Sequence, residues 1–204
     1  MSEEQASLAL TESGSVDDWR FRALGLLPLL FFLAQGIHYG RLNQLGHMLW
    51  MCNIGNLLLA AGLLSGRPLL IRVAAVWTIP GLIMWLLFVV GVWGIIFASV
   101  LAHVGGLIVG LFALRRVRIN PRDWVYAFGW YLLVQLASRW FTPIEFNVNV
   151  SQKMYSGWEQ RFSSFWKFWL VMSLLVGLML WALTLGLSKL WPPGPETGPE
   201  SVSV

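Results

Sequence analysis

Two stretches, HMLWMCNIGN (residues 47–56) and SVLAHVGG (residues 99–106), lie on either side of a long apolar run. The first contains the only cysteine of the chain, Cys52, and the second contains His103. The sequence around both is apolar enough to lie in lipid, where ionisable side chains are costly and mark functional sites. We therefore predict membrane-embedded helices with a polar site between two of them.

The composition indicates a membrane protein. The chain of 204 residues is 57% hydrophobic and 12% charged, whereas an ordinary soluble domain is about 25% charged. The net charge of +4 is compatible with nucleic-acid binding, but the Arg and Lys residues stand at the ends of apolar segments, where they act as topology signals. We expect a protein of the cell membrane, the inner membrane if the source is bacterial, that contacts membrane lipid and binds no nucleic acid.

Apolar segments cover most of the length and predict a single all-α domain, a polytopic membrane helix bundle of about six transmembrane helices. A crossing needs about 20 residues, so the apolar run 69–114 is divided in two. The predicted spans are residues 23–38, 45–64, 69–90, 95–114, 124–141 and 165–187. They form a transmembrane domain over residues 23–190, between an acidic segment, 1–22, and a Pro/Gly-rich tail, 191–204, both predicted to be disordered.

Proline and glycine residues predict details of helix packing. Pro80 predicts a kink in the third span. Gly106 and Gly110 in the fourth span, and Gly62 in the second, fit faces of small residues on which a neighbouring helix can approach closely. Such faces are common in membrane bundles and indicate packing without indicating a function.

The basic residues predict the orientation. If the N-terminus is cytoplasmic, its side holds nine basic residues and the opposite side holds five. Cytoplasmic loops carry the excess of Lys and Arg, so we predict that both termini are cytoplasmic. The nine residues are Arg20, Arg22, Arg67, Arg72, Arg115, Arg116, Arg118, Arg122 and Lys189, and the five are Arg41, Arg139, Lys153, Arg161 and Lys167.

The polar residues inside the predicted spans fall at one depth. Cys52 and His103 lie seven and eight positions into helices that descend from the outer face, which places both roughly 10 to 12 Å below that face. By the i, i+4 rule Asn56 shares the helix face of Cys52, with Asn53 beside it, and Ser99 shares the face of His103. Two polar faces could therefore meet across the bundle.

These residue types suggest a site for nucleophilic catalysis. A buried thiol alone is an inert, small hydrophobic residue, but a histidine within hydrogen-bond reach can take its proton and leave a thiolate nucleophile. We therefore nominate Cys52 as the nucleophile, His103 as the base, and Asn53 or Asn56 as the donor to a developing oxyanion. Each has a structural alternative: a core thiol, an imidazole satisfied by Ser99 or a backbone carbonyl, and amides that hold helices together.

Two other functions stay open. One is a haem b protein in which His103 pairs with His47 or His38 as axial ligands. The other is a non-enzymatic membrane scaffold or subunit, whose polar residues only join helices. The histidines have no carboxylate near them in sequence, so we predict no metal site, and acyl transfer requires no cofactor. The motif NVS at residues 149–151 has the spelling of a glycosylation acceptor.

About half of the chain resembles a known family. The segments are LWMCNIGNLLLAAGLL (49–64), VAAVWTIPG (73–81) and AHVGGLIVGLFAL (102–114), and the likeness extends weakly toward Trp140. Their order resembles a transmembrane acyltransferase family whose animal member remodels ether phospholipids and which includes many bacterial integral membrane proteins. The resemblance implies acyl transfer by a Cys/His pair, here Cys52 and His103.

The chain departs from the pattern of that family at two positions. A histidine commonly stands two residues before the cysteine, where this chain has Trp50, and an acidic residue often follows it, where this chain has Asn53. His47 is the nearest upstream histidine, and its spacing from Cys52 puts it on a different helix face. Our leading hypothesis is a multi-pass membrane protein that acts as a lipid acyltransferase or lipid-ester hydrolase in the outer half of the bilayer.

Overall fold

The computed structural model describes residues 16, 18–91 and 96–190. Helices joined by turns and loops make up these residues, and no strand occurs among them, which confirms the predicted all-α class. The α-helices are α2 (Trp19–Ala23), α3 (Leu26–Arg41), α4 (Met51–Ser65), α5 (Pro68–Gly91), α6 (Phe97–Val100), α7 (Gly106–Ala113), α8 (Asp123–Phe141) and α9 (Phe165–Leu190). The chain also forms the 3₁₀ helices η1 (Leu45–Leu49) and η3 (Val148–Val150) and the π-helix η2 (Leu101–Gly105).

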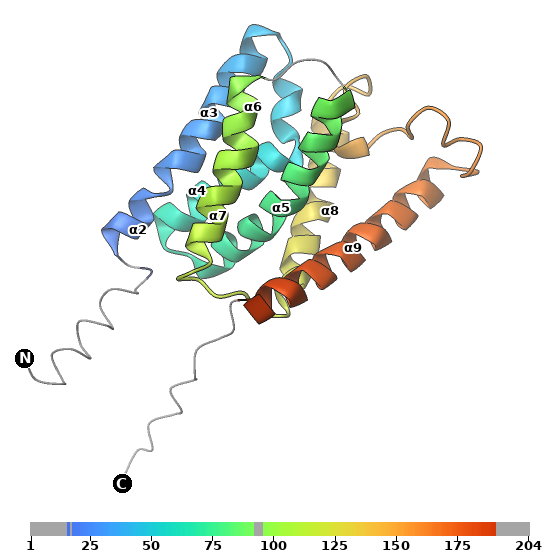
Figure 1. Cartoon of the computed structure of the whole chain (residues 1–204). Coiled ribbons are helices and arrows are strands. Elements are labelled where there is room, and N and C mark those ends of the chain that lie inside the picture. The colour runs from blue at the N-terminus through green and yellow to red at the C-terminus, as the bar shows by residue number, and fades with distance from the viewer. Residues whose placement is uncertain (1–15, 17, 92–95, 191–204) are drawn as a thin grey trace, which may run out of the picture.

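The helical segments alternate in direction along the bundle (Figure 1). α3 leads away from the end where α2 begins, α4 returns, α5 leads away again, and η2 with α7 returns. The start of α2 and the end of α9 consequently lie at the same end of the bundle, and α9 lies at its outside. This arrangement places every predicted span in helical structure.

We predicted that residues 1–22 and 191–204 are disordered. Most of the first segment and all of the second lie outside the residues that the structure describes. The end of the first segment is different, because α2 already begins at Trp19. The side chain of Asp18 caps this helix by accepting a hydrogen bond from the backbone N–H of Arg20 at 3.0 Å. A capping Asp before an amphipathic turn is a helix start signal, so part of the acidic segment belongs to the helical domain.

Three helices among the described residues are long and apolar enough to cross a membrane, Trp19–Arg41, Pro68–Leu87 and Phe165–Leu190. Two other apolar helices are shorter, Met51–Ser65 and Phe97–Ala113. The structure therefore contains fewer full-length spanning helices than the predicted six. One local cause is that the first residues of the second predicted span form η1, and Trp50, with ψ of 135°, separates η1 from α4.

A tight turn fixes α4 against α5. Gly66 ends α4 in the left-handed conformation, with φ of 64°, and the N–H of Arg67 donates to the carbonyl of Gly62 at 2.9 Å. A Cβ added at Gly62 would lie 2.8 Å from the backbone nitrogen of Ile71. The two helices thus approach more closely than a side chain at Gly62 would allow, which confirms its predicted packing role.

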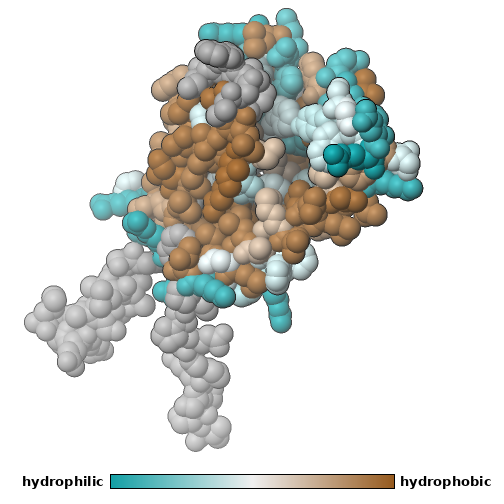
Figure 2. Space-filling model, turned by 45° about the vertical axis from the view of Figure 1, so that its right-hand side comes forward, coloured by the Kyte–Doolittle hydropathy of each residue, from teal (hydrophilic) through white to brown (hydrophobic). Residues whose placement is uncertain are grey.

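The outside of the bundle exposes many large apolar side chains, and its interior encloses polar side chains beside an apolar core. Large apolar residues are exposed along the helices that form the outside, among them Leu30, Ile37, Ile83, Ile108, Leu133 and Leu174. Polar residues lie inside, among them Gln35, Asn53, Asn56, His103, Gln135 and Ser173. Figure 2 shows a hydrophobic surface over the middle of the bundle and hydrophilic residues toward its ends. An apolar exterior around a mainly apolar core (Leu59, Leu63, Ile71, Val76) that also encloses polar side chains is compatible with a protein that lies in a membrane.

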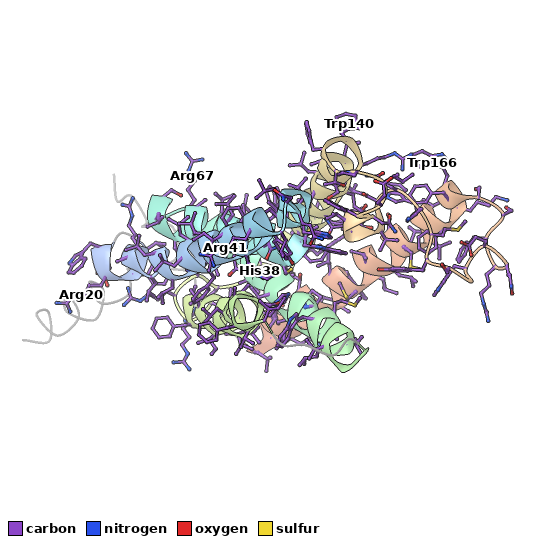
Figure 3. All side chains as sticks on the ribbon, turned by 90° about the horizontal axis from the view of Figure 1, so that it is seen from above. Arg20, His38, Arg41, Arg67, Trp140 and Trp166 are labelled. Carbon is purple, nitrogen blue, oxygen red and sulfur yellow. The ribbon has the colours of Figure 1, made fainter. Side chains whose placement is uncertain are left out.

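Several arginine and tryptophan side chains lie on the outside of the bundle. Arg20 and Arg67 point outward, as do Trp140 of α8 and Trp166 of α9 (Figure 3). Tryptophan is enriched at membrane interfaces, and arginine is enriched on the cytoplasmic side. Exposed residues of these types are compatible with the predicted roles at the ends of membrane spans.

An ion pair joins α5 to α8 at the end where α2 begins. Nε of Arg72 lies 2.7 Å from Oδ2 of Asp123, whose side chain is 3% exposed. The same carboxylate accepts the backbone N–H of Asn120 at 2.7 Å. A second pair, between Arg116 and Asp18 at 2.9 Å, is partly exposed.

We predict that Asp123→Asn lowers the free energy of unfolding by about 2 to 3 kcal/mol, because removal of one partner leaves a largely buried charge without its counter-ion. Asp18→Asn is the matched control and should have a clearly smaller effect, since its pair is open to solvent. Chemical denaturation of the purified protein in detergent measures both changes. Equal losses in the two variants would contradict the prediction.

Candidate functional site

Cys52 and His103 line the same pocket. The pocket lies between the start of α4, the middle of α5 and η2. Its lining residues are Met51, Cys52, Gly55, Asn56, Trp77, Thr78, Gly81, Ala102 and His103. The structure therefore brings together three of the four residues that we nominated from the sequence.

Small residues and backbone irregularities make room for this pocket. A Cβ added at Gly81 would lie 3.7 Å from Cβ of Cys52, and one added at Gly55 would meet nothing within 4 Å. Pro80, inside α5, has no N–H to donate to the preceding turn. The volume open to the centre of a water molecule is about 10 Å³, which is the space of one water. In this conformation the pocket has room for one water molecule but not for an acyl chain.

The thiol lies in the first turn of a helix. α4 begins at Met51, so Cys52 is its second residue, and Trp50, before it, provides no side-chain cap. Unpaired backbone N–H groups give a helix N-terminus a partial positive charge.

The imidazole of His103 is oriented by its own helix. Its Nδ1 lies 2.7 Å from the carbonyl oxygen of Ser99, and the ring of Trp85 stacks on it with centroids 5.1 Å apart. A carbonyl only accepts, so Nδ1 carries the proton and Nε2 of the neutral ring is left as the base. The side chain is buried, with 7% of the residue exposed. Ser99 and His103 thus interact as the i, i+4 spacing predicts.

No hydrogen bond joins the Cys52 thiol to the imidazole among those of the described residues. The two side chains share a pocket without being in direct contact. Both residues line one pocket with the volume of a single water, so proton transfer between them would need a bridging water or a movement that brings them together.

Asn56 joins α4 to η2. Its Nδ2 donates to the carbonyl of Cys52 at 2.9 Å and to the carbonyl of Ala102 at 2.9 Å. Both N–H groups are therefore engaged, and none is left for an oxyanion. Its Oδ1 has no hydrogen-bond partner among the described residues and lies against Gly106, where an added Cβ would be only 2.6 Å away.

Asn53 lies outside the pocket lining. It is 1% exposed, and its Nδ2 donates to the carbonyl of His47 at 3.1 Å. One of its N–H groups remains without a described acceptor, and its Oδ1 is also unpaired among the described residues. Asn53 thus joins η1 to α4, and it is the only one of the two amides with a donor to spare.

The other histidines belong to a separate aromatic cluster. The ring of His47 stacks on Phe146, with centroids 4.5 Å apart, and on Tyr39 at 5.3 Å. Its Nδ1 accepts the indole N–H of Trp50 at 2.9 Å. His38 packs against the other side of Tyr39. Among the described residues no group of three or more His, Cys, Asp or Glu side chains could hold a metal ion.

Sequence reasoning missed several residues of the site. Trp85 carried no signal, because its contact with His103 joins two helices that are not related by any spacing rule. Trp77 and Thr78 were included only in the segment 73–81 that carries the family resemblance, with no role assigned to either. Trp77 donates to the carbonyl of Ala127 at 3.0 Å and so ties the pocket wall to α8.

Comparison of the chain with protein-family models, with curated proteins and with solved structures finds no match. The pocket itself therefore carries the functional conclusion.

We predict that Gly106→Ala lowers the free energy of unfolding by about 1 to 3 kcal/mol, because the new methyl group would overlap Oδ1 of Asn56 and strain the α4 to η2 contact. Gly129→Ala, on exposed α8 surface with nothing within 4 Å of the new Cβ, is the matched control. It should leave stability unchanged or raise it by up to about 1 kcal/mol. Denaturation in detergent compares the two, and a neutral Gly106→Ala would refute the close contact.

Proposed function

We propose that this chain is a multi-pass protein of the cell membrane that transfers or hydrolyses an acyl group of a membrane lipid, with Cys52 as the nucleophile and His103 as the base. One observation carries the proposal: the only thiol of the chain and a buried imidazole with a free Nε2 line the same pocket. Paired nucleophile and base within reach of a shared cavity are what covalent acyl transfer requires.

We also propose that all six predicted segments cross the bilayer, with both termini in the cytoplasm. The alternation of helix directions supports this (Figure 1), as does the exposed apolar surface of the helices. α4 has 15 residues, or about 22 Å at 1.5 Å per residue. A helix shorter than the hydrocarbon core is accommodated by local thinning of the bilayer or by polar flanks that reach the interface, and η1 extends this segment.

The chemistry balances with the residues present. Sγ of Cys52 attacks the ester carbonyl of a lipid while its proton passes to Nε2 of His103. The carbon–oxygen bond then breaks, the leaving alcohol takes that proton, and a thioester remains on Cys52. An acceptor alcohol or water next attacks the thioester with His103 again as the base, which releases the acyl product and restores the thiol.

Both N–H groups of Asn56 are engaged, and Asn53, which keeps one N–H free, lies outside the pocket lining. Asn53 could donate to an oxyanion only after a rearrangement at the start of α4. The size of the pocket adds a further requirement. A lipid ester enters only if the part of α5 beyond Pro80 moves away from η2, which would also lift Trp85 from His103. Such opening is common where a site is closed to solvent between turnovers.

A non-enzymatic membrane scaffold is the second candidate. The hydrogen bonds of Asn53 and Asn56 favour it, because both amides join backbone segments and do so without any ligand. The haem b alternative is favoured by no feature of the described residues: the pocket beside His103 has the volume of one water, and His47 packs among aromatic rings.

The test is the pH dependence of Cys52 alkylation by a neutral maleimide on the purified protein in detergent. We expect the midpoint of the rate against pH to rise by about one unit or more in His103→Gln, because an imidazolium near the sulfur stabilises the thiolate. His38→Gln is the matched control, a histidine outside the pocket, and should leave the midpoint in place. Cys52→Ser gives the background, since no other thiol is present.

Identical profiles in the wild type and in His103→Gln would refute the pair and leave the scaffold as the better reading. If the pair is found, lipid esters labelled in the acyl chain should transfer label to the wild-type protein and not to Cys52→Ser. A scaffold would instead keep its function in both variants.

A further inference from the structure

The loop after α8 turns back into the bundle. Val148 of η3 is fully buried and Ser151 is 2% exposed, although both belong to the polar connection between the last two long helices. Phe146, just before them, packs on Gly46 and stacks on His47 of η1. Loops normally run over the surface, so burial of segment 147–151 needs a reason.

The segment is tied to the last turns of α8 by side chains. Nε2 of Gln135 donates to the backbone carbonyl of Asn149 at 2.7 Å. Arg139 donates to the carbonyl of Ser151 at 2.8 Å, and Gln152 donates to the carbonyl of Thr142 at 2.6 Å. These bonds satisfy backbone groups that burial would otherwise leave without partners.

The side chain of Asn149 reaches the wall of the pocket. Its Oδ1 accepts the backbone N–H of Met51 at 2.9 Å. Its Nδ2 donates to the carbonyl of Leu49 and to Oγ of Ser138, both at 2.8 Å. Asn149 therefore supplies, from across the bundle, the cap that Trp50 does not give to α4. Met51 and its neighbour Cys52 both line the pocket.

The backbone of the segment is held in an unusual conformation. Asn147, Asn149 and Val150 have φ of 43°, 54° and 57°. Asn adopts this left-handed region readily, but a β-branched residue rarely does. Such a conformation persists only where the surrounding structure determines it, and here the surroundings are α8, η1 and the start of α4.

We propose that Asn149 is a positioning residue for Cys52, and that segment 147–151, which is buried against the start of α4, shields this turn and its thiol from water. Asn149 fixes the first turn of α4, and with it the direction of the thiol. The inference goes beyond acyl transfer, because it concerns the geometry and accessibility of the thiol whatever that thiol does.

The chain offers a matched pair of variants. Asn147 and Asn149 are the same residue type in the same segment, and both have positive φ, which glycine tolerates. Asn147 bonds only within the loop, to Gln152 and Lys153, whereas Asn149 bonds to α4 and α8. Asn149→Gly and Asn147→Gly thus differ in the contact with α4.

The experiment measures the rate at which the full chain in liposomes reacts at Cys52 with a charged, membrane-impermeant methanethiosulfonate. We expect Asn149→Gly to raise this rate by about tenfold or more, on the scale of the loss of one or two buried hydrogen bonds. Asn147→Gly should change it less than about twofold. Asn149→Asp has the shape of Asn and keeps an acceptor for the N–H of Met51, so it should restore most of the protection. Asn149→Leu has a similar shape and no acceptor and should not restore it, whereas a purely bulk-filling role would make the two variants alike.

Equal rates in the two glycine variants, or fast reaction of the wild type with the charged reagent, would overturn the inference. If Asn149→Gly does not fold, the comparison of Asn149→Asp with the wild type decides, since unchanged protection supports the cap and full exposure refutes it. The ratio of the rate in Asn149→Gly to the rate in the wild type should be the same when both also carry His103→Gln. Failure of the Cys/His pair and failure of the role proposed for segment 147–151 therefore give different results.

Discussion

The bundle depends on amide side chains that satisfy backbone carbonyls where helices meet. Asn56 bonds the carbonyl of Ala102, Asn149 bonds that of Leu49, and Gln135 bonds that of Asn149. In apolar surroundings there is no water to replace such a bond, so each one both permits an irregular backbone and fixes it in one arrangement. The breaks at Trp50, in η2 and in η3 all lie beside one of these amides, and the pocket lies between the first two.

The same constraint shapes the chemistry available to the pocket. The carbonyl oxygen of Ser99 accepts the Nδ1–H of His103. This hydrogen bond decides the tautomer and leaves Nε2 unprotonated. Both amide hydrogens of Asn56, in contrast, are donated to backbone carbonyls, those of Cys52 and Ala102. These two polar residues of the pocket therefore differ in what they can offer a ligand: His103 keeps Nε2 as an acceptor, and Asn56 has no N–H left to donate.

Much of the architecture could be predicted from the sequence, because runs of apolar residues and their flanking charges depend on local composition. The helical segments, the close contacts at Gly62 and Gly106, and the shared face of Ser99 and His103 follow from such local patterns. The expectation that Cys52 and His103 lie near each other was inferred from their equal depth in the predicted spans. Both residues line the same pocket.

What could not be predicted depends on contacts between distant residues. No spacing rule places Trp85 on His103, and none gives Asn149 a role at the start of α4, nearly a hundred residues earlier in the chain. The motif NVS at residues 149–151 has the spelling of a glycosylation acceptor, yet its Asn and Ser lie within the bundle. Three helices among the described residues are long and apolar enough to cross a membrane, fewer than the about six spans predicted, because hydropathy does not register where a helix is interrupted.

The π-helix of five residues, Leu101–Gly105, has a consequence for the register of the fourth helical segment. A π-turn holds one residue more than an α-turn, so it rotates everything after it by about 100° relative to an uninterrupted helix. That rotation sets Gly106 on Asn56 and Gly110 on Ala75 and Thr78 while His103 faces the pocket. The extra residue thus brings two faces of one helical segment into register, the face that packs on α4 and α5 and the face that lines the pocket.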